Sequence, residues 1–155
     1  MTRKEKAKRD NETRPDAKTY LRQYIYASLA INGGMDELAS LRVLAEKATS
    51  SISGQPKGSG CSREEIICKM VDLEKELDEK IDRMVELRIK IEKEISLVAD
   101  QRYRSILQMR YINGWTLEKI AVETGYSWRQ VNRIHGQALE RFRKDVIECH
   151  IDPVI

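Results

Sequence analysis

Apolar residues recur at helical spacing along most of this chain. Leu21, Tyr24, Ile25 and Leu29 fit one face of a helix that starts at residue 17, and Gly33-Gly34 is expected to stop it. A second helix is predicted after the glycines, with an apolar face made of Met35, Leu38, Leu41, Ala45 and Ala48. The pattern therefore predicts two helices before residue 49.

A much longer helix is predicted from residue 62 onward. Ser62 and Glu65 form an S-x-x-E capping box in front of an apolar run. A 3.5-residue apolar repeat follows, through Ile66, Met70, Leu73, Leu77, Met84, Leu87, Ile91 and Val98. About 37 residues at 1.5 Å each make a rod of ~55 Å, too long for a small globule to cover. Two interpretations stay open and are compatible: a helical hairpin within the chain, and a coiled-coil seam between two copies.

Two segments lack this periodicity. Residues 1–16 are expected to be a disordered basic tail, either solubilising or in contact with phosphates, and residues 49–62, rich in Ser and Gly, a flexible loop. The expected organisation is all-α: a helical or coiled-coil segment over 17–100, then a separate domain over 101–148.

The C-terminal part carries the most specific local signals. A helix from residue 101 is closed by Asn113-Gly114, and Thr116 caps the short helix that follows. Gly125 stands where the chain must turn, since glycine takes a left-handed conformation without steric cost. Ser127 and Gln130 form a second capping box, and Tyr126 and Val131 occupy the positions of a hydrophobic staple.

These signals together predict a helix-turn-helix. Ala121 is small enough to let the two helices approach, and Gly125 makes the corner four residues later. Val131, six residues after the glycine, and Ile134 anchor the second helix on the first. This spacing is the usual one for the motif.

Charge is distributed unevenly along the chain, although the net charge is only +3. Residues 63–100 carry eight basic and twelve acidic side chains, whereas residues 101–145 carry nine basic and four acidic ones. The first 22 residues add about four positive charges. This asymmetry indicates that the C-terminal part meets a negatively charged partner.

The segment "SILQMRYINGWTLEKIAVETGYSWRQVNRIHGQALERFRK" resembles region 4 of bacterial sigma factors over about 40 residues. The wider layout resembles phage and prophage proteins with sigma-like C-termini, similar in style to late-gene transcription activators. The resemblance implies double-stranded DNA as partner, with RNA polymerase as a second contact. The chain has no counterpart of the region with which sigma factors melt promoters, so initiation of transcription by this chain alone is not implied.

With Val131, Ile134, Ala138, Leu139 and Phe142 facing inward, the last long helix turns a polar face outward. Its expected DNA contacts are Trp128, Arg129, Gln130, Asn132, Arg133 and Gly136, joined by Thr116 and Lys119 of the preceding helix. Arginine pairs with guanine, asparagine or glutamine with adenine, and Trp128 can pack on a thymine methyl or on sugar. Gly136 would permit a close approach, either to DNA or to another helix of the protein.

Several of these residues also have a purely structural interpretation. Trp128 can cover the edge of its own core, and Gln130 can fold back as the partner of the cap. His135 flanks the buried face and is expected to be a packing or hydrogen-bonding residue rather than a ligand. Arg141, Arg143 and Lys144 can be phosphate contacts or a solvated helix end. Arg129 and Arg133 are the strongest candidates, since neither has an obvious carboxylate within a turn.

Other functions find little support in the sequence. Cys61, Cys68 and Cys149 show no metal-binding spacing and are expected to be free thiols in a reducing cytoplasm. No apolar run approaches the ~18 residues of a membrane span. With two histidines and no glycine-rich phosphate loop, neither an enzyme nor a cofactor is expected.

The predicted function is therefore a sequence-specific transcription regulator, an activator encoded by a phage or prophage. Two alternatives remain: a DNA-recognition subunit like small terminases, and a non-DNA adaptor that binds RNA polymerase. Ring-like assembly would favour the first alternative. An unchanged phenotype in Arg129→Ala and Arg133→Ala would favour the adaptor.

Overall fold

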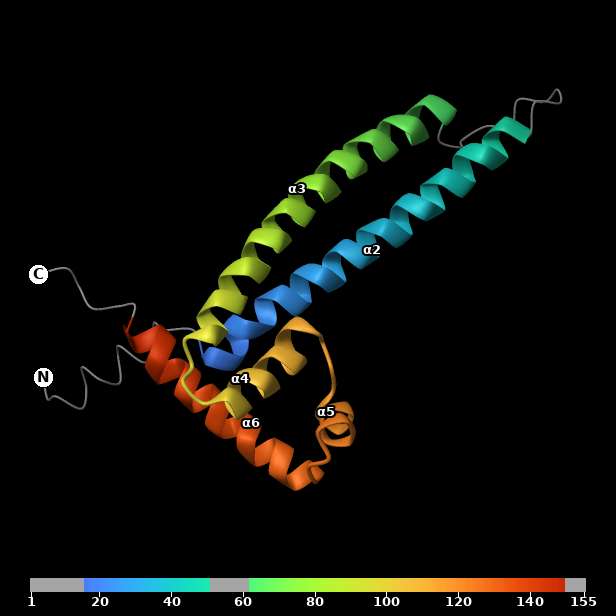
Figure 1. Ribbon diagram of the computed structural model, residues 1–155. Helices are drawn as coiled ribbons and strands as arrows, with labels where there is room; N and C mark the ends of the chain where they lie inside the picture. Colours follow the sequence, from blue (N-terminus) through green and yellow to red (C-terminus); the bar gives the residue numbers. More distant parts are fainter. Residues whose placement is uncertain (1–15, 51–61, 150–155) are drawn as a thin grey trace, which may run out of the picture. The chain divides into compact units, whose positions relative to one another are not determined.

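The structure, a computed structural model, describes residues 16–50 and 62–149, and these residues are almost entirely helical, with no strand among them (Figure 1). The expected tail, apart from Asp16, and the expected loop over residues 51–61 lie outside the described residues. The elements in chain order are α2 (Ala17–Ser50), α3 (Arg63–Ser96), α4 (Gln101–Leu107), η1 (Gln108–Ile112, a π-helical turn), α5 (Leu117–Thr124), α6 (Trp128–Phe142) and η2 (Arg143–Glu148, also π-helical). None of the described helices is both long enough and apolar enough to cross a membrane.

Gly33 and Gly34 do not stop the first helix, so the prediction of two separate helices is wrong. α2 runs through both glycines and continues as far as Ser50, two residues into the expected loop. The physical reason is tertiary packing: a Cβ atom at Gly34 would collide with the side chain of Leu77 in α3. Gly34 thus permits close contact between two helices, which offsets its low helix propensity of ~1 kcal/mol relative to alanine.

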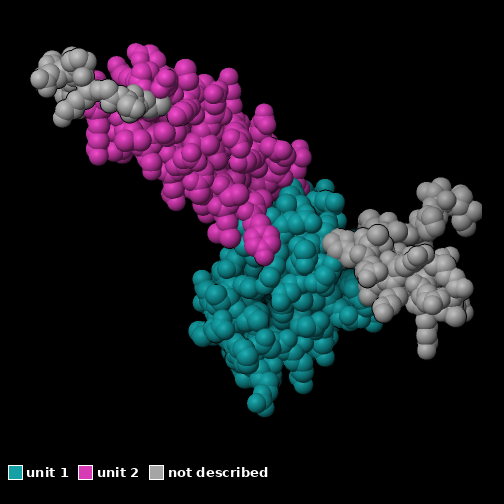
Figure 2. Space-filling view, turned by 180° about the vertical axis from the view of Figure 1, so that it is seen from behind, with its two compact units in different colours: residues 1–25, 87–155 teal, residues 26–86 magenta. Residues whose placement is uncertain are grey.

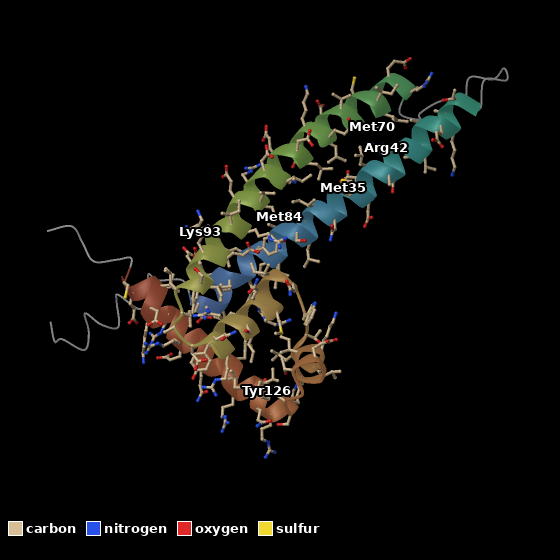
Figure 3. The ribbon with its side chains drawn as sticks, viewed as in Figure 1. Met35, Arg42, Met70, Met84, Lys93 and Tyr126 are labelled. Carbon is tan, nitrogen blue, oxygen red and sulfur yellow. The ribbon has the colours of Figure 1, made fainter. Side chains whose placement is uncertain are left out.

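Residues 26–86 form one of two compact units in the chain (Figure 2). Within it, α2 and α3 pair antiparallel and bury Ile31, Leu38, Ile66 and Leu77. Arg42, labelled in Figure 3, donates to Glu74 across the pair at 3.0 Å. The predicted capping box starts α3, because Ser62 N–H donates to Glu65 Oε2 at 3.0 Å and Ser62 Oγ accepts from Glu65 N–H at 3.3 Å. The apolar stripe of α3 is therefore used within the chain, as the hairpin interpretation expects.

The other unit, residues 1–25 and 87–155, combines both ends of the helical segment with the C-terminal domain. Its boundaries differ from the domain boundary expected at residue 100, since the first turns of α2 and the last turns of α3 belong to it. These turns supply Ala17, Leu21, Ile91 and Ile95 to a shared core, whose other members are Val98, Leu107, Tyr111, Ile112, Ala138, Phe142 and Val146. The core therefore holds α6 against residues far away in sequence.

Polar contacts reinforce this unit. The Tyr20 hydroxyl donates to Glu94 Oε2 at 2.7 Å, while its ring lies 6.2 Å from that of Phe142, centroid to centroid. Burial and the hydrogen bond to Glu94 raise the pKa of Tyr20 above its usual value. These contacts fix the first turns of α2 to both α3 and α6.

Arginine side chains fasten the turns between the short helices. Arg104 donates to the carbonyl oxygens of Val98 and Ala99 at 2.7 and 3.0 Å, and Arg110 donates to that of Trp115 at 2.7 Å. Two of the basic residues that give the C-terminal part its positive charge therefore have structural partners.

His135 is buried in α6 and shares a hydrogen bond of 3.0 Å with the Tyr111 hydroxyl, the rings being stacked. The prediction that this histidine is a packing and hydrogen-bonding residue is thus confirmed. Burial lowers the pKa of His135 to about 4, with smaller contributions from nearby cations including Arg110, and raises that of Tyr111 to about 12. At neutral pH the imidazole is uncharged.

The low pKa of His135 makes stability depend on pH. Above pH 6.5 the side chain is neutral in both states; as the pH falls from 6.5 towards 4, only the unfolded state binds the proton, and stability is lost. The expected loss from this residue is up to about 3 kcal/mol. Urea unfolding at pH 7, 5.5 and 4.5 should show a steeper loss for the wild type than for His135→Gln. Equal slopes would contradict this assignment.

Candidate nucleic-acid interface

The turn between α5 and α6 is built by local contacts, as the sequence predicts. Thr116 Oγ1 accepts from Lys119 N–H at 3.2 Å at the start of α5, and Gly125 ends that helix with a left-handed φ of 72°. Ser127 Oγ accepts from Gln130 N–H at 3.2 Å, while Gln130 Oε1 accepts from Ser127 N–H at 3.0 Å. Both halves of the capping box are present, so the direction in which α6 begins is fixed.

A second core cluster joins the two helices. Ile106, Ile120, Val131 and Ile134 are buried together, with Ala121 packed against them. Val131 and Ile134 are the predicted anchors of α6, and the cluster confirms them. Because these residues occupy one side of α6, the opposite side of the helix faces away from the core.

Arg129 and Arg133 lie on that outward side and are exposed. No carboxylate in the described part of the chain forms an ion pair or hydrogen bond with either guanidinium group. They stand four residues apart, one turn of α6, in the half of the helix that begins at the capping box. Two unpaired guanidinium groups at this spacing can each offer a pair of donors to a base edge or to a phosphate.

The other cations of α6 and η2 differ in having carboxylate partners on the same helical stretch. Arg141 pairs with Asp145 at 2.9 Å, Arg143 with Glu140 at 2.9 Å, and Lys144 with Glu140 at 3.4 Å. Arg143 and Lys144, with the largest contribution from Arg143, lower the pKa of Glu140. These contacts agree with the interpretation of residues 141–144 as a solvated helix end.

Trp128 is the first residue of α6 and is 56% exposed. Its indole N–H donates to Glu118 Oε1 of α5 at 3.2 Å. Glu118 was missed by the sequence analysis, because residues ten apart in sequence and separated by a turn give no periodic signal. Hydrogen bonds from its own backbone N–H and from the side chains of Thr116 and Trp128 lower the pKa of Glu118, so the carboxylate is ionised.

Asn132 and Gln130 use part of their hydrogen-bonding capacity within α6. Asn132 Nδ2 donates to the Trp128 carbonyl oxygen at 3.1 Å, which leaves its side-chain oxygen as an acceptor. Gln130 Oε1 also accepts from Ser127 Oγ, at 3.1 Å. The structural role expected for Gln130 is therefore confirmed, and pairing of this side chain with adenine would have to compete with the cap.

Thr116 and Lys119, the remaining predicted contacts, lie at the start of α5 and are exposed. The hydroxyl of Thr116 is engaged in the helix cap described above. The Lys119 ammonium lies 4.4 Å from the centroid of the Trp115 ring, a cation–π contact that leaves its charge accessible to phosphate.

Gly136 continues the outward face of α6 beyond Arg133. A Cβ atom at this position would meet no atom within 4 Å, so the protein itself does not require a glycine here. Close packing against another helix of the described residues therefore does not explain why this position is a glycine. Around it lies a shallow hollow between α6 and the start of α4, lined in part by Tyr103, Gln137 and Lys144.

Replacing Gly136 by alanine should move stability and DNA binding in opposite directions. The free energy of unfolding should rise by up to ~1 kcal/mol, since alanine favours a helix and nothing opposes its methyl group. Affinity for DNA should fall on the order of tenfold if the duplex approaches the backbone at this position. Urea unfolding and a fluorescence-anisotropy titration measure the two effects. Unchanged affinity would mean that no part of the duplex approaches Gly136 closely.

Residues 100–144 match the model of the family described as "Sigma-70, region 4". Neither the curated proteins nor the solved structures gave a match to the chain. The family match covers Asp100 at the start of α4, the whole helix-turn-helix and the outward face of α6, and it indicates a DNA-binding helix-turn-helix.

Proposed function

We propose that this chain is a sequence-specific regulator of transcription that reads double-stranded DNA with the outward face of α6. The observation that carries the proposal is a contrast within one helical stretch. No carboxylate among the described residues pairs with the exposed Arg129 or Arg133, whereas Arg141, Arg143 and Lys144 have carboxylate partners. The unpaired arginines stand in the N-terminal half of α6, the half that a recognition helix presents to the major groove. Phosphate contacts would supply most of the affinity and make it salt-dependent.

The test is recovery of bound DNA. Fragments of the source genome should be captured with the full chain and again with Arg129→Ala, and both pools sequenced. Fragments held by the wild type should share a short motif, and that motif should lose its enrichment in the variant pool. Recovery of random fragments by both proteins would refute sequence-specific reading.

The proposal extends to activation in a phage or prophage, with RNA polymerase as second partner. Its support is the resemblance of the segment to sigma region 4 and of the layout to phage late-gene activators. In vitro transcription from a promoter carrying the recovered motif tests this extension. Transcripts should increase in the presence of the chain, and a decrease would mark a repressor instead.

We also propose that a second copy packs on the unit formed by residues 26–86. Among the described residues of this unit, four apolar residues are buried, whereas eight large ones are between 42% and 59% exposed: Tyr26, Leu29, Met35, Val43, Leu44, Ile67, Val71 and Val85. Two helices alone rarely bury enough surface to be stable. Sedimentation should show a dimer, which Leu29→Glu should weaken. A ring-like assembly would favour the small-terminase alternative, and a monomer at every concentration would contradict the dimer.

A further inference from the structure

Trp128 presents the largest exposed side chain of α6. It occupies the first position of the helix, next to Arg129, and more than half of its surface is accessible. It does not belong to the core cluster that joins α5 and α6. Covering the edge of the protein's own core therefore explains only the buried part of the indole, and the exposed part is left unexplained.

The polar atom of the indole is already in use. Its N–H, the only donor of the ring, is directed at Glu118 Oε1 at 3.2 Å. What remains exposed consists of carbon atoms, so Trp128 as held here offers an apolar surface and no hydrogen bond to a phosphate or a base. A carboxylate beside a polyanion weakens association, and Glu118 is therefore best explained as a positioning residue for the indole.

In the major groove of unmodified DNA, the apolar group available to such a surface is the C5 methyl group of thymine. We infer that Trp128, held by Glu118, reads a pyrimidine C5 methyl group in the major groove, so that the recognised site contains a thymine at the position facing the start of α6. This inference rests on the proposed DNA reading by α6. It adds a specificity determinant that discriminates by contact with a methyl group, alongside the donor pairs of Arg129 and Arg133.

The test replaces thymine by deoxyuridine, which removes the methyl group and leaves the hydrogen-bonding edge unchanged. Each thymine of the recovered motif is replaced in turn, and affinity is measured by fluorescence anisotropy with the full chain. At one thymine of the motif, the substitution should weaken binding about fourfold, as expected for one buried methyl group, and Trp128→Ala should abolish this difference. The chain should also bind a duplex with 5-methyldeoxycytidine at this position more tightly than the same duplex with deoxycytidine.

Variants of Glu118 separate positioning from charge. Glu118→Gln keeps an acceptor for the indole N–H and should retain the fourfold preference for thymine over deoxyuridine, while binding all duplexes more tightly. Glu118→Ala should also bind duplexes in general more tightly but lose the preference, because the indole is no longer held. Arg141→Ala, which changes a side chain paired with Asp145, serves as a control that keeps the preference.

The outcomes distinguish this inference from the proposed function. If the wild type binds the motif but no thymine shows the methyl effect, or if Trp128→Ala retains that effect, the inference is wrong while DNA reading stands. If the chain binds no DNA motif at all, the proposed function itself fails. Retention of the thymine preference in Glu118→Ala would leave Trp128 as the reader and overturn the positioning role of Glu118.

Discussion

Replacing Arg129 and Arg133 together by alanine will remove sequence-selective binding and leave the fold intact. Each guanidinium group in a paired contact to a base contributes ~1–3 kcal/mol of discrimination, so each single variant should lose between about fivefold and 150-fold in affinity for the recovered motif. Both side chains are exposed, and within the described part of the chain neither forms an ion pair or a hydrogen bond. Circular dichroism and urea unfolding should therefore match the wild type.

Two further variants show whether these arginines read bases or only neutralise phosphates. Substitution of both by lysine keeps the charge and hence the salt dependence, but removes the paired donors and should lose preference for the motif. Arg141→Ala, in which the lost cation was already paired with Asp145, should change affinity only slightly. If the double alanine variant weakens motif and random duplexes equally, the two arginines contact phosphates only.

Phe142→Ala should be the most damaging single change to the unit that carries the helix-turn-helix. Its ring is fully buried in the core shared by α2, α3, α4, η1, α6 and η2, and it lies against Tyr20. Removal of a buried phenylalanine ring costs about 3–5 kcal/mol, through lost burial and the cavity left behind. Urea unfolding followed by circular dichroism measures this loss.

Val122→Ala provides the comparison for Phe142→Ala, since Val122 is 81% exposed on α5 and its truncation should change stability by less than ~0.5 kcal/mol. If both variants unfolded at the same urea concentration, the shared core would not hold the unit together. Loss of stability on removal of residues 1–25 would independently support the contribution of α2 to this core.

Signals that act over a few residues could be predicted from the sequence. The capping boxes at Ser62 and Ser127 and the left-handed turn at Gly125 depend on neighbours within four residues, so the residue types alone specify them. The inward and outward sides of α6 follow from the same local periodicity. The helix-turn-helix, confirmed by structure and family match, is the sum of such local signals.

Features that depend on distant residues could not be predicted in this way. Gly33-Gly34 is locally a stop signal, and only the contact of Gly34 with Leu77 shows why the helix continues. The spacing of apolar residues within each helix does not show that Leu21 and Phe142 share one core. The same holds for Glu118 and Trp128, because the hydrogen bond between them requires the turn to bring α5 and α6 together.

The central claim is that the N-terminal half of α6 enters a duplex, and amide chemical shifts test it most directly. A ¹⁵N-labelled chain is titrated with a duplex carrying the recovered motif, and the shifts of each backbone amide are followed. The largest changes should fall at residues 128–136, with smaller ones at residues 116–119, and residues 26–48 should be unaffected by the duplex. Changes concentrated at residues 137–148 or in the unit formed by residues 26–86, with residues 128–136 unmoved, would contradict the claim.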